Sequence, residues 1–322
     1  MNNALYAAAG IAAVALLPTT AWTQNYPNRP IRVVVPSSAG SAVDFTARAM
    51  APRFTEAWGQ AIVIDNRAGA GGILAHDIVA KATADGYTLI LSTSSGLVLN
   101  PLLYKTPYDS LKDFAPISMA SINPQMLFSN IAVPAKSVSE LIALAKAKPG
   151  QLNCASAGTG TPNHMGCELL KSMGKIDFVL VPYKGATPGI TNVIGGQAQF
   201  MFNSIPAVLP LTRAGKLRAR GVAGTKRSPV APDVPTVGET LPGFECINWY
   251  SMLAPAGTPP AIINKINAEM VKMIADQTFA KRLLDMGSEP QSSSPVDLAD
   301  YMRKETDRWR KVIKAAGIKA ER

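Results

Sequence analysis

The sequence predicts an α/β fold with two lobes that are joined by two crossing strands. Along most of the 322 residues, short apolar segments bounded by turn residues alternate with segments of helical periodicity, which is typical of parallel strands connected by helices. Two loops rich in small residues, 36–44 and 156–164, each follow an apolar segment and open into a helix. Since these loops are far apart in the chain, we expect one in each lobe and a single ligand between them.

The first lobe is expected to start with strands and helices in alternation. Uninterrupted apolar residues predict its strands, and apolar and small residues at helical spacing predict its helices. The expected strands are 31–35, 62–64 and 87–91, the expected helices are 43–58 and 74–81, and a glycine turn at 66–72 precedes the second helix.

The second lobe is expected to begin where an extended segment, 125–133, leaves the first unit and Ser137 caps the next helix. The remaining expected strands are 152–155, 178–182, 198–202, 218–222 and 246–253, and the remaining expected helices are 138–147, 165–173, 189–194, 207–214, 260–275 and 295–315.

The predicted first lobe is discontinuous. The segment 246–253 is expected to cross back to it, so both chain ends belong to the first lobe. This lobe comprises residues 24–127 and 252–322, and the second lobe comprises residues 128–251. With 322 residues and 47% hydrophobic content, the chain is large enough for two lobes of ordinary size.

The first residues are typical of an export signal. Residues 5–17 are apolar and rich in alanine, Pro18 ends this run, and small residues precede a cleavage site near residue 23. No Lys or Arg precedes the run, but it is shorter than the roughly 20 residues that a membrane span needs, which favours cleavage over an uncleaved anchor. We therefore expect a signal peptide at 1–23 and a soluble mature protein outside the cytoplasm.

The formal net charge of +10 lies in the mature part, because residues 1–23 contain no Lys, Arg, Asp or Glu. A positive field of this kind attracts anions to a cleft. The Lys and Arg residues are scattered and form no basic stripe with interleaved aromatic residues, which argues against a nucleic-acid partner. His76 and His164 have no metal-ligand spacing, so neither a metal nor another cofactor is expected.

The cysteines allow two interpretations. Cys154 and Cys167 flank the second loop, and Cys246 lies far downstream. In an oxidising compartment the first two suit a disulfide, because one would end a strand and the other would lie in the following helix. It is an equally good interpretation that all three cysteines are unpaired and serve as small buried hydrophobic side chains.

The second loop has the composition of an anion-binding loop. Gly158 and Gly160 allow several backbone N–H groups to point in one direction, nearby hydroxyl groups add donors, and the helix start adds the positive end of a dipole. The first loop has the same character. The predicted ligand-binding residues are Ser38, Ala39, Gly40, Ser41, Ala42, Asp44 and Ser94 in the first lobe, and Ser156, Gly158, Thr159, Gly160, Thr161, His164, Tyr183 and Asn203 in the second.

Known catalytic loop motifs do not match these loops. Ser156 has no Gly-x-Ser-x-Gly context, no glycine loop ends in Gly-Lys-Ser or Gly-Lys-Thr, and Leu74 stands where a dinucleotide motif starting at Gly69 needs a third glycine. Neutral donors suit reversible capture of a small carboxylate. An exported enzyme is therefore the less favoured class.

Several further motifs occur in order along nearly the whole mature chain. They are YPNRPI at 26–31, NRAGAGG at 66–72, DGYTL at 85–89, NPLLY at 100–104, KDFAP at 112–116, the loop at 156–164, VPYKG at 181–185, RAGKLR at 213–218 and LAPAGTP at 253–259. On these motifs the chain resembles the periplasmic solute receptors of tripartite tricarboxylate transporters, which are called Bug or TctC receptors.

The resemblance implies a monomeric periplasmic receptor with a two-lobed periplasmic-binding-protein fold of type II, the Venus flytrap. It implies that the loop after the first strand and the loop that opens at Ser156 jointly hold one carboxylate, partly through bridging waters. Membrane transporter subunits would then receive the ligand. Ligand sensing with a membrane histidine kinase, on the same fold, is the alternative.

The first loop departs from the family pattern. Gly40 and Asp44 remain, but Ser41 stands in place of a second glycine and Val43 removes a side-chain donor. Asn203 lies where relatives often carry an aspartate, which removes a partner for an ammonium group. We therefore expect a carboxylate without an obligatory amine, such as a di- or hydroxycarboxylate or an aromatic acid.

Some individual residues keep two interpretations. His164 either donates to the ligand or braces its loop through a backbone carbonyl. Asp44 either accepts bonds from loop N–H groups or binds a hydroxyl or ammonium group of the ligand, beside the plain role of an acid in a first helical turn. Lys184 either lines the cleft beside Tyr183 or is a solvated surface charge.

Overall fold

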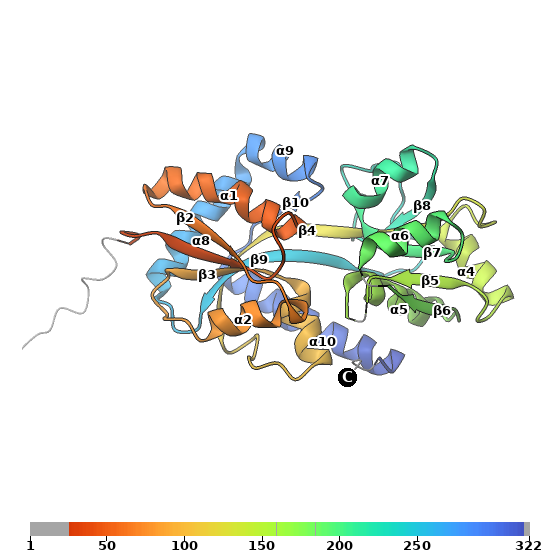
Figure 1. Ribbon diagram of the computed structural model, residues 1–322, viewed down its shortest axis with the longest axis horizontal. Helices are drawn as coiled ribbons and strands as arrows, with labels where there is room; N and C mark the ends of the chain where they lie inside the picture. Colours follow the sequence, from red (N-terminus) through yellow and green to blue (C-terminus); the bar gives the residue numbers. More distant parts are fainter. Residues whose placement is uncertain (1–25, 159, 184, 319–322) are drawn as a thin grey trace, which may run out of the picture.

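The computed structural model describes residues 26–318 except residues 159 and 184. The predicted signal peptide and its cleavage site lie outside these residues. The described chain forms two lobes, and two long strands connect them (Figure 1). The predicted two-lobed α/β architecture is confirmed. No helix in the described part of the chain is long and apolar enough to cross a membrane.

Parallel strands form the centre of the first lobe. β1 lies between β2 and β3 and pairs with both in parallel, and β9 and β4 continue the sheet beyond β3 in antiparallel orientation. The elements up to the first crossing are β1 (Ile31–Val35), α1 (Ala42–Trp58), β2 (Ile62–Asn66), the short helix η1 (Ala70–Gly72), α2 (Ile73–Ala80), β3 (Thr88–Thr93), the π-helical segment η2 (Ser95–Leu99) and α3 (Asn100–Leu103).

The second lobe has its own set of paired strands. β5 pairs in parallel with β6 and β7, whereas β7 and β8 pair antiparallel with the end of β4. Its elements are α4 (Val138–Ala147), β5 (Asn153–Ser156), α5 (Pro162–Gly174), β6 (Val179–Pro182), α6 (Ala186–Ile194), β7 (Phe200–Ser204), α7 (Ile205–Arg213), β8 (Leu217–Val222) and the short helix η3 (Val237–Glu239).

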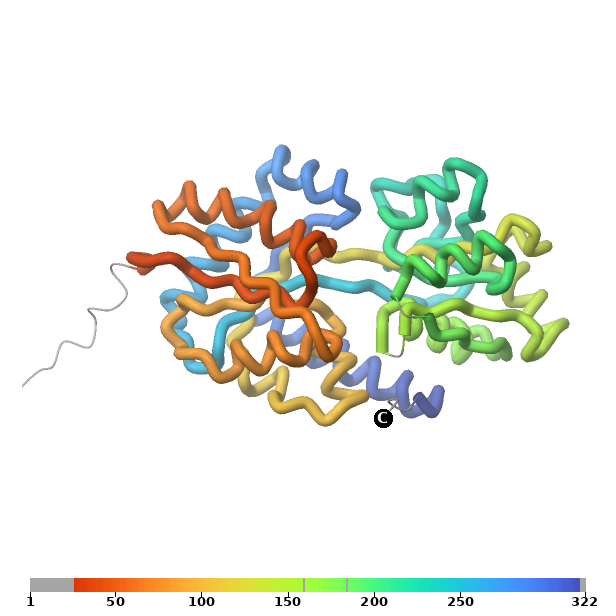
Figure 2. Tube along the Cα trace, viewed as in Figure 1, coloured from red at the N-terminus to blue at the C-terminus, as the bar shows by residue number. Residues whose placement is uncertain are grey.

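Two strands run between the lobes in opposite directions (Figure 2). β4 (Phe114–Asn130) leaves the first lobe, and its pairing passes from β9 to β7 and β8 between Pro124 and Gln125. β9 (Ile247–Pro255) returns and pairs with β4 and β3. The expected second crossing strand is therefore present, while the residue limits of the two lobes stay a prediction.

The chain ends with helices that belong to the first lobe. These last elements are α8 (Pro260–Ala275), α9 (Gln277–Asp285), β10 (Glu289–Pro290) and α10 (Pro295–Ala316). α10 packs against β4 and also reaches α5 of the second lobe. It is therefore a third connection between the lobes, beside the crossing strands.

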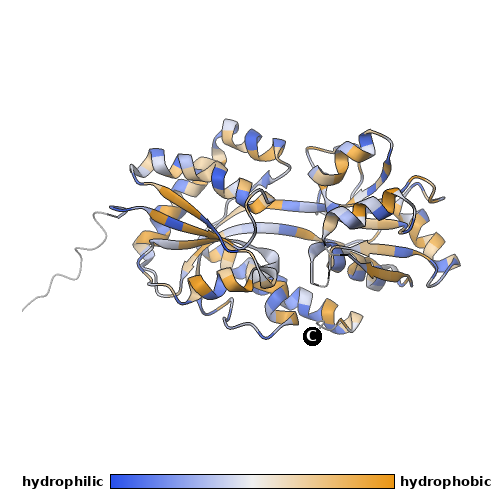
Figure 3. Cartoon of the chain, viewed as in Figure 1, coloured by the Kyte–Doolittle hydropathy of each residue, from blue (hydrophilic) through white to orange (hydrophobic). Residues whose placement is uncertain are grey.

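A hydrophobic cluster continues from one lobe to the other. Figure 3 shows apolar residues concentrated on the strands and alternating with polar residues along the helices. The shared cluster contains Val34 and Ile90 of the first lobe, Met165 and Phe202 of the second, Trp249 of β9, and Leu298, Met302 and Trp309 of α10. Burial of this apolar surface stabilises the observed arrangement of the lobes.

The predicted elements differ from the structure most at β4 and α9, and the short elements η2, α3, η3 and β10 were not predicted. β4 begins at Phe114 rather than at residue 125, because its first half buries polar residues such as Ser118 and Ser121 and so lacks an apolar signal. The prediction also misses α9. Asp276 ends α8 and caps α9 at the same time, so no loop separates the two helical patterns.

A buried carboxyl group lies beside the crossing strands. Glu289 of β10 accepts a hydrogen bond from Ser228 Oγ of the second lobe, with an oxygen–oxygen distance of 2.6 Å. Together with Glu245 and Tyr301 it lines a cavity of about 140 Å³. Burial raises the pKa of Glu289, while the hydrogen bond from Ser228 and the charge of Lys226 act in the opposite direction.

We expect Glu289→Gln to raise the free energy of unfolding at pH 8 and to change it little near pH 4. The folded-state pKa lies above the unfolded value, so the favourable contribution of the protonated group is complete at low pH and is lost as the pH rises through the folded pKa. Glutamine keeps the oxygen that accepts from Ser228. Urea unfolding at both pH values tests this, with the exposed Glu56→Gln as control, and an equal effect at the two pH values contradicts it.

Candidate ligand-binding site

Strand directions place the two predicted loops on the sides of the lobes that face each other. β4 and β9 run antiparallel between the lobes. β3 is antiparallel to β9 and β1 is parallel to β3, so the carboxyl ends of β1 and β3 point toward the second lobe. β7 is antiparallel to β4, and β5 and β6 run parallel to β7, so their carboxyl ends point toward the first lobe. The segments that follow these strands therefore face the opposite lobe, as at ligand sites of other α/β sheets (Figure 1).

A close approach between the lobes occurs at the second loop. Gly160 has a φ of +75°, and a Cβ atom placed on it would lie 2.9 Å from Leu103 Cδ1 and 3.8 Å from Tyr104 Cε2. Both neighbours belong to the first lobe, at the end of α3. Ser94, which follows β3, donates to Oδ1 of Asn248 on β9 at 2.7 Å. The second loop, α3 and the start of η2 thus border one interlobe region.

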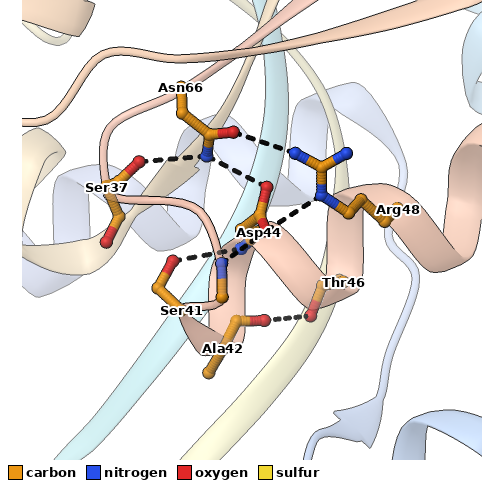
Figure 4. A network of polar contacts seen from close by, with 8 residues as sticks. Ser37, Ser41, Ala42, Asp44, Thr46, Arg48 and Asn66 are labelled. Carbon is orange, nitrogen blue, oxygen red and sulfur yellow. Dashed lines mark hydrogen bonds and ion pairs between the residues drawn. The ribbon is translucent and has the colours of Figure 1, made fainter.

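The first loop is folded around the side chain of Asp44, which is 1% exposed. Its Oδ2 accepts hydrogen bonds from the Gly40 N–H at 2.8 Å and from Arg48 Nε at 3.0 Å. Its Oδ1 accepts from Asn66 Nδ2 at 2.9 Å, and this amide also donates to Ser37 O at 3.0 Å (Figure 4). These contacts support the interpretation in which Asp44 braces its own loop.

The carboxylate of Asp44 is ionised and locally neutralised. Burial alone would raise its pKa, but hydrogen bonds from Arg48, Gly40 and Asn66 outweigh this effect and hold the pKa of Asp44 below its usual range. Arg48 pairs with it at 3.0 Å. An anion can therefore approach the loop without facing an uncompensated negative charge.

The N-terminus of α1 supplies the remaining donors of the first loop. Ser41 caps this helix, because its Oγ accepts the Asp44 N–H at 3.4 Å and its own N–H donates to Ser38 O at 3.2 Å. The N–H of Gly40 is also used inside the loop. Among the described residues we find no acceptor for the N–H of Ala42, as is usual in a first helical turn. Ala42, rather than Gly40, thus offers a backbone donor.

Internal hydrogen bonds close the second loop. Thr161 caps α5: its Oγ1 donates to Gly158 O at 2.6 Å and accepts the His164 N–H at 3.3 Å. The Tyr183 N–H donates to Ser156 O at 2.9 Å and so links the ends of β5 and β6. Gly158 has a φ of +118°, a backbone conformation that glycine adopts more easily than other residues.

Two buried donors at the ends of paired strands lack an acceptor. Ser156 ends β5 and is 1% exposed, and Asn203 lies near the end of β7 and is 6% exposed. Within the described part of the chain, neither Ser156 Oγ nor Asn203 Nδ2 has a hydrogen-bond partner, whereas Asn203 Oδ1 accepts the Ser204 N–H at 2.8 Å. Unpaired buried donors cost free energy unless a ligand or water pairs with them, so we predict a ligand or water contact at each of these two atoms.

The other predicted residues differ in their exposure. His164 is buried, and its Nε2 lies 3.9 Å from Glu168 Oε1 of the same helix, which leaves both of its interpretations open. Thr159 and Lys184 lie outside the described residues. Ser38, Ala39, Gly40 and Ala42 are exposed, Ser41, Gly158, Thr161 and Tyr183 are half-buried, and Ser94 and Gly160 are buried. Direct contact of each residue with a ligand stays a prediction.

Three residues that support the site, Asn66, Arg48 and Asn248, were not predicted from the sequence. A signal existed for Arg48, because a spacing of four residues places it on the same helix face as Asp44. Asn66 is the first residue of the motif at 66–72, which was predicted only as a glycine turn. Asn248 had no signal, since its partner Ser94 is 154 positions away in the chain.

The structure also decides the roles of the cysteines and of His76. Cys154 and Cys167 form a disulfide with a Cα–Cα distance of 6.6 Å, and Cys246 is buried and free, with a pKa that burial raises to about 12. His76 lies in the core, with Nδ1 2.8 Å from Gly72 O and Nε2 2.6 Å from Ser92 Oγ. Burial lowers the pKa of His76 to about 4, so it is neutral at physiological pH.

Two α/β lobes joined by crossing strands, with loops of both lobes at one interlobe region, define a two-lobed solute-binding receptor. Comparison with known families agrees with this class. The family described as "Tripartite tricarboxylate transporter family receptor", TctC, matches residues 46–318. The chain belongs to this family of periplasmic receptors, as the resemblance implied.

Individual relatives cover nearly the whole chain. The UPF0065 protein in the tcbD-tcbE intergenic region of a Pseudomonas species is 38% identical over 94% of this chain and 92% of its own. Protein BugT of Bordetella pertussis is 36% identical over 97% of this chain and 95% of its own. Both are similar to this chain along essentially their full length.

Solved structures share the fold. R. palustris Rpa4515 with adipate has a TM-score of 0.81 and 35% identity and covers 92% of this chain and 100% of its own. MatC (Rpa3494) from Rhodopseudomonas palustris with bound malate has a TM-score of 0.75 and 35% identity and covers 89% of this chain and 100% of its own. These two neighbours are carboxylate-bound members of the same fold.

Proposed function

We propose that this receptor binds a small carboxylate between its lobes and delivers it to membrane transporter subunits. The observation that carries the proposal is the pair of buried donors without partners, Ser156 Oγ and Asn203 Nδ2, at strand ends that point toward the opposite lobe. The N-termini of α1 and α5 add backbone donors from both lobes.

The energetics support this assignment. Hydrogen bonds to a charged group contribute about 1.5–3 kcal/mol each, so four or five of them contribute about 6–15 kcal/mol, and most of this range exceeds the roughly 8 kcal/mol of a micromolar complex. The excess offsets the costs of association and of ordering the site. The donors are neutral and Asp44 is paired with Arg48, which suits a ligand that must be released again.

The ligand class follows from the donors and from the neighbours. Rpa4515 and MatC contain adipate and malate, so we propose a dicarboxylate or hydroxycarboxylate for this chain. Asn203 is uncharged and offers no ion pair to an ammonium group. The ligand therefore needs no amine.

Isothermal titration of the purified mature protein tests the proposal. Succinate, malate and adipate are titrated beside aspartate and glutamate, and we expect tighter binding of the amine-free acids. Tighter binding of aspartate or glutamate than of the matched dicarboxylates would refute the amine-free ligand class. No binding of any carboxylate would refute the proposed function.

The variant Ser156→Ala assigns the binding position in the same titration. Loss of one hydrogen bond to a charged group is expected to weaken binding about 10- to 100-fold. Ser172→Ala, at an exposed position of α5, is the matched control and should bind like the wild type. An unchanged Kd of Ser156→Ala places the ligand elsewhere.

The proposal includes export and a monomeric receptor. We infer that residues 1–23 are removed on export and that the chain acts as a binding protein without catalysis. The lobe limits at residues 127/128 and 251/252 belong to the same proposal. Genes for membrane transporter subunits beside its gene would support delivery, and an adjacent two-component system would indicate sensing instead.

A further inference from the structure

A covalent link encloses the second loop. Cys154 lies in β5, two residues before Ser156, and Cys167 lies in α5, 13 residues further along the chain. The loop that carries Gly158, Gly160 and the cap of α5 lies entirely between them. Both cysteine side chains are fully buried.

Hydrogen bonds fix the two sides of the loop separately, and Asn163 Nδ2 at the start of α5 also donates to Phe202 O of β7 at 2.6 Å. Thr161 Oγ1 bonds Gly158 O within the loop, and the Tyr183 N–H bonds Ser156 O at the strand end. None of these bonds joins the incoming strand to the body of the outgoing helix, whereas the disulfide does. Two glycines in left-handed conformations make the loop backbone permissive, so an unrestrained loop would lose much freedom on binding a ligand.

We propose that the Cys154–Cys167 disulfide is a positioning element of the ligand site. It holds β5 and α5 together so that Ser156 and the N-terminus of α5 keep their binding geometry before the ligand arrives. The ligand then does not bear the cost of ordering the loop. This inference rests on the proposed function of the second loop. Because both sulfur atoms are buried, the link is expected to persist in the folded receptor.

The double variant Cys154→Ala/Cys167→Ala tests the inference. We expect its Kd for malate or adipate to be about five- to tenfold weaker than that of the wild type, at a temperature where circular dichroism shows both proteins folded. We also expect faster amide hydrogen exchange at Gly158, Gly160, Thr161 and Asn163 in the ligand-free variant. A thiol titration of the unfolded wild type should detect one thiol, that of Cys246.

A matched control separates positioning from general stability. Val138→Ala truncates a buried side chain in α4, at the outer end of the second lobe (Figure 1), and should lower the melting temperature without changing the Kd. If the double variant behaves in the same way, or if the wild type shows three thiols, the inference is overturned while the proposed function stands. If the wild type binds no carboxylate, the proposed function fails and the inference fails with it.

Discussion

Replacing Asp44 with alanine is expected to weaken carboxylate binding at least about tenfold and to lower the free energy of unfolding by about 2–4 kcal/mol. The carboxylate is buried and accepts from Gly40, Arg48 and Asn66. Its removal leaves these donors without their acceptor and removes the centre around which the first loop is folded. Titration calorimetry and urea unfolding of the variant measure the two effects.

The control for this variant is Asp65→Ala. Asp65 lies in β2 and is also paired with two arginines, Arg32 and Arg67, but it makes no bond to the first loop. We expect its Kd to match the wild type and its stability to fall by less than about 1 kcal/mol, because the pairs are partly exposed. Should Asp44→Ala bind as tightly as Asp65→Ala, Asp44 does not shape the site.

Replacing Glu305 with alanine is expected to lower the free energy of unfolding by about 3 kcal/mol or more. Glu305 is 5% exposed and accepts from Arg308 Nε at 2.7 Å, from Arg308 Nη2 at 2.9 Å and from Trp309 Nε1 at 3.1 Å. Burial opposes the charged form of Arg308, but the hydrogen bonds and charge of Glu305 outweigh it and raise the pKa of Arg308. Without Glu305 a largely buried cation loses its counter-charge.

This ion pair also connects α10 to the crossing strand. Arg308 Nη1 donates to Glu245 O at 2.7 Å, just before β9 begins. Asp307→Ala on the same helix is the matched control, since Asp307 pairs with Arg310 at an exposed position and should change stability by less than about 0.5 kcal/mol. Urea unfolding of both variants measures the difference, and equal stabilities would show that the buried pair is dispensable.

Much of the fold could be predicted from local patterns. Helix α8 begins and ends where expected, because Pro260 opens the helix and the apolar spacing continues to Ala275. The first half of β4 could not be predicted, because its buried serines are polar and their environment depends on β9 and on the segment around Ser293. Local pattern identifies an element only when burial follows hydrophobicity.

The candidate site was partly predictable, because some of its features depend only on residues that are close in sequence. The glycines and hydroxyl groups of both loops act within a few residues, so Gly160, Ser41 and Thr161 could be named as candidates from the sequence, although the roles of Ser41 and Thr161 as helix caps were not predicted. The bond from the Gly40 N–H to Asp44 agrees with one of the interpretations of Asp44, in which its carboxylate accepts from loop N–H groups. The bond between Ser94 and Asn248 could not be inferred, because it depends on how distant segments pack.

The sequence by itself determined which segments form the loops and to which family the chain belongs. Only the tertiary structure decided that the carboxyl end of β1 faces the second lobe and that of β5 faces the first. It also decided that Cys154 bonds to Cys167, and that the buried atoms Ser156 Oγ and Asn203 Nδ2 have no hydrogen-bond partner among the described residues. The physical reason is that strand direction and burial arise from pairing and packing between segments far apart in the chain. Capping and backbone conformation depend on neighbours within one turn.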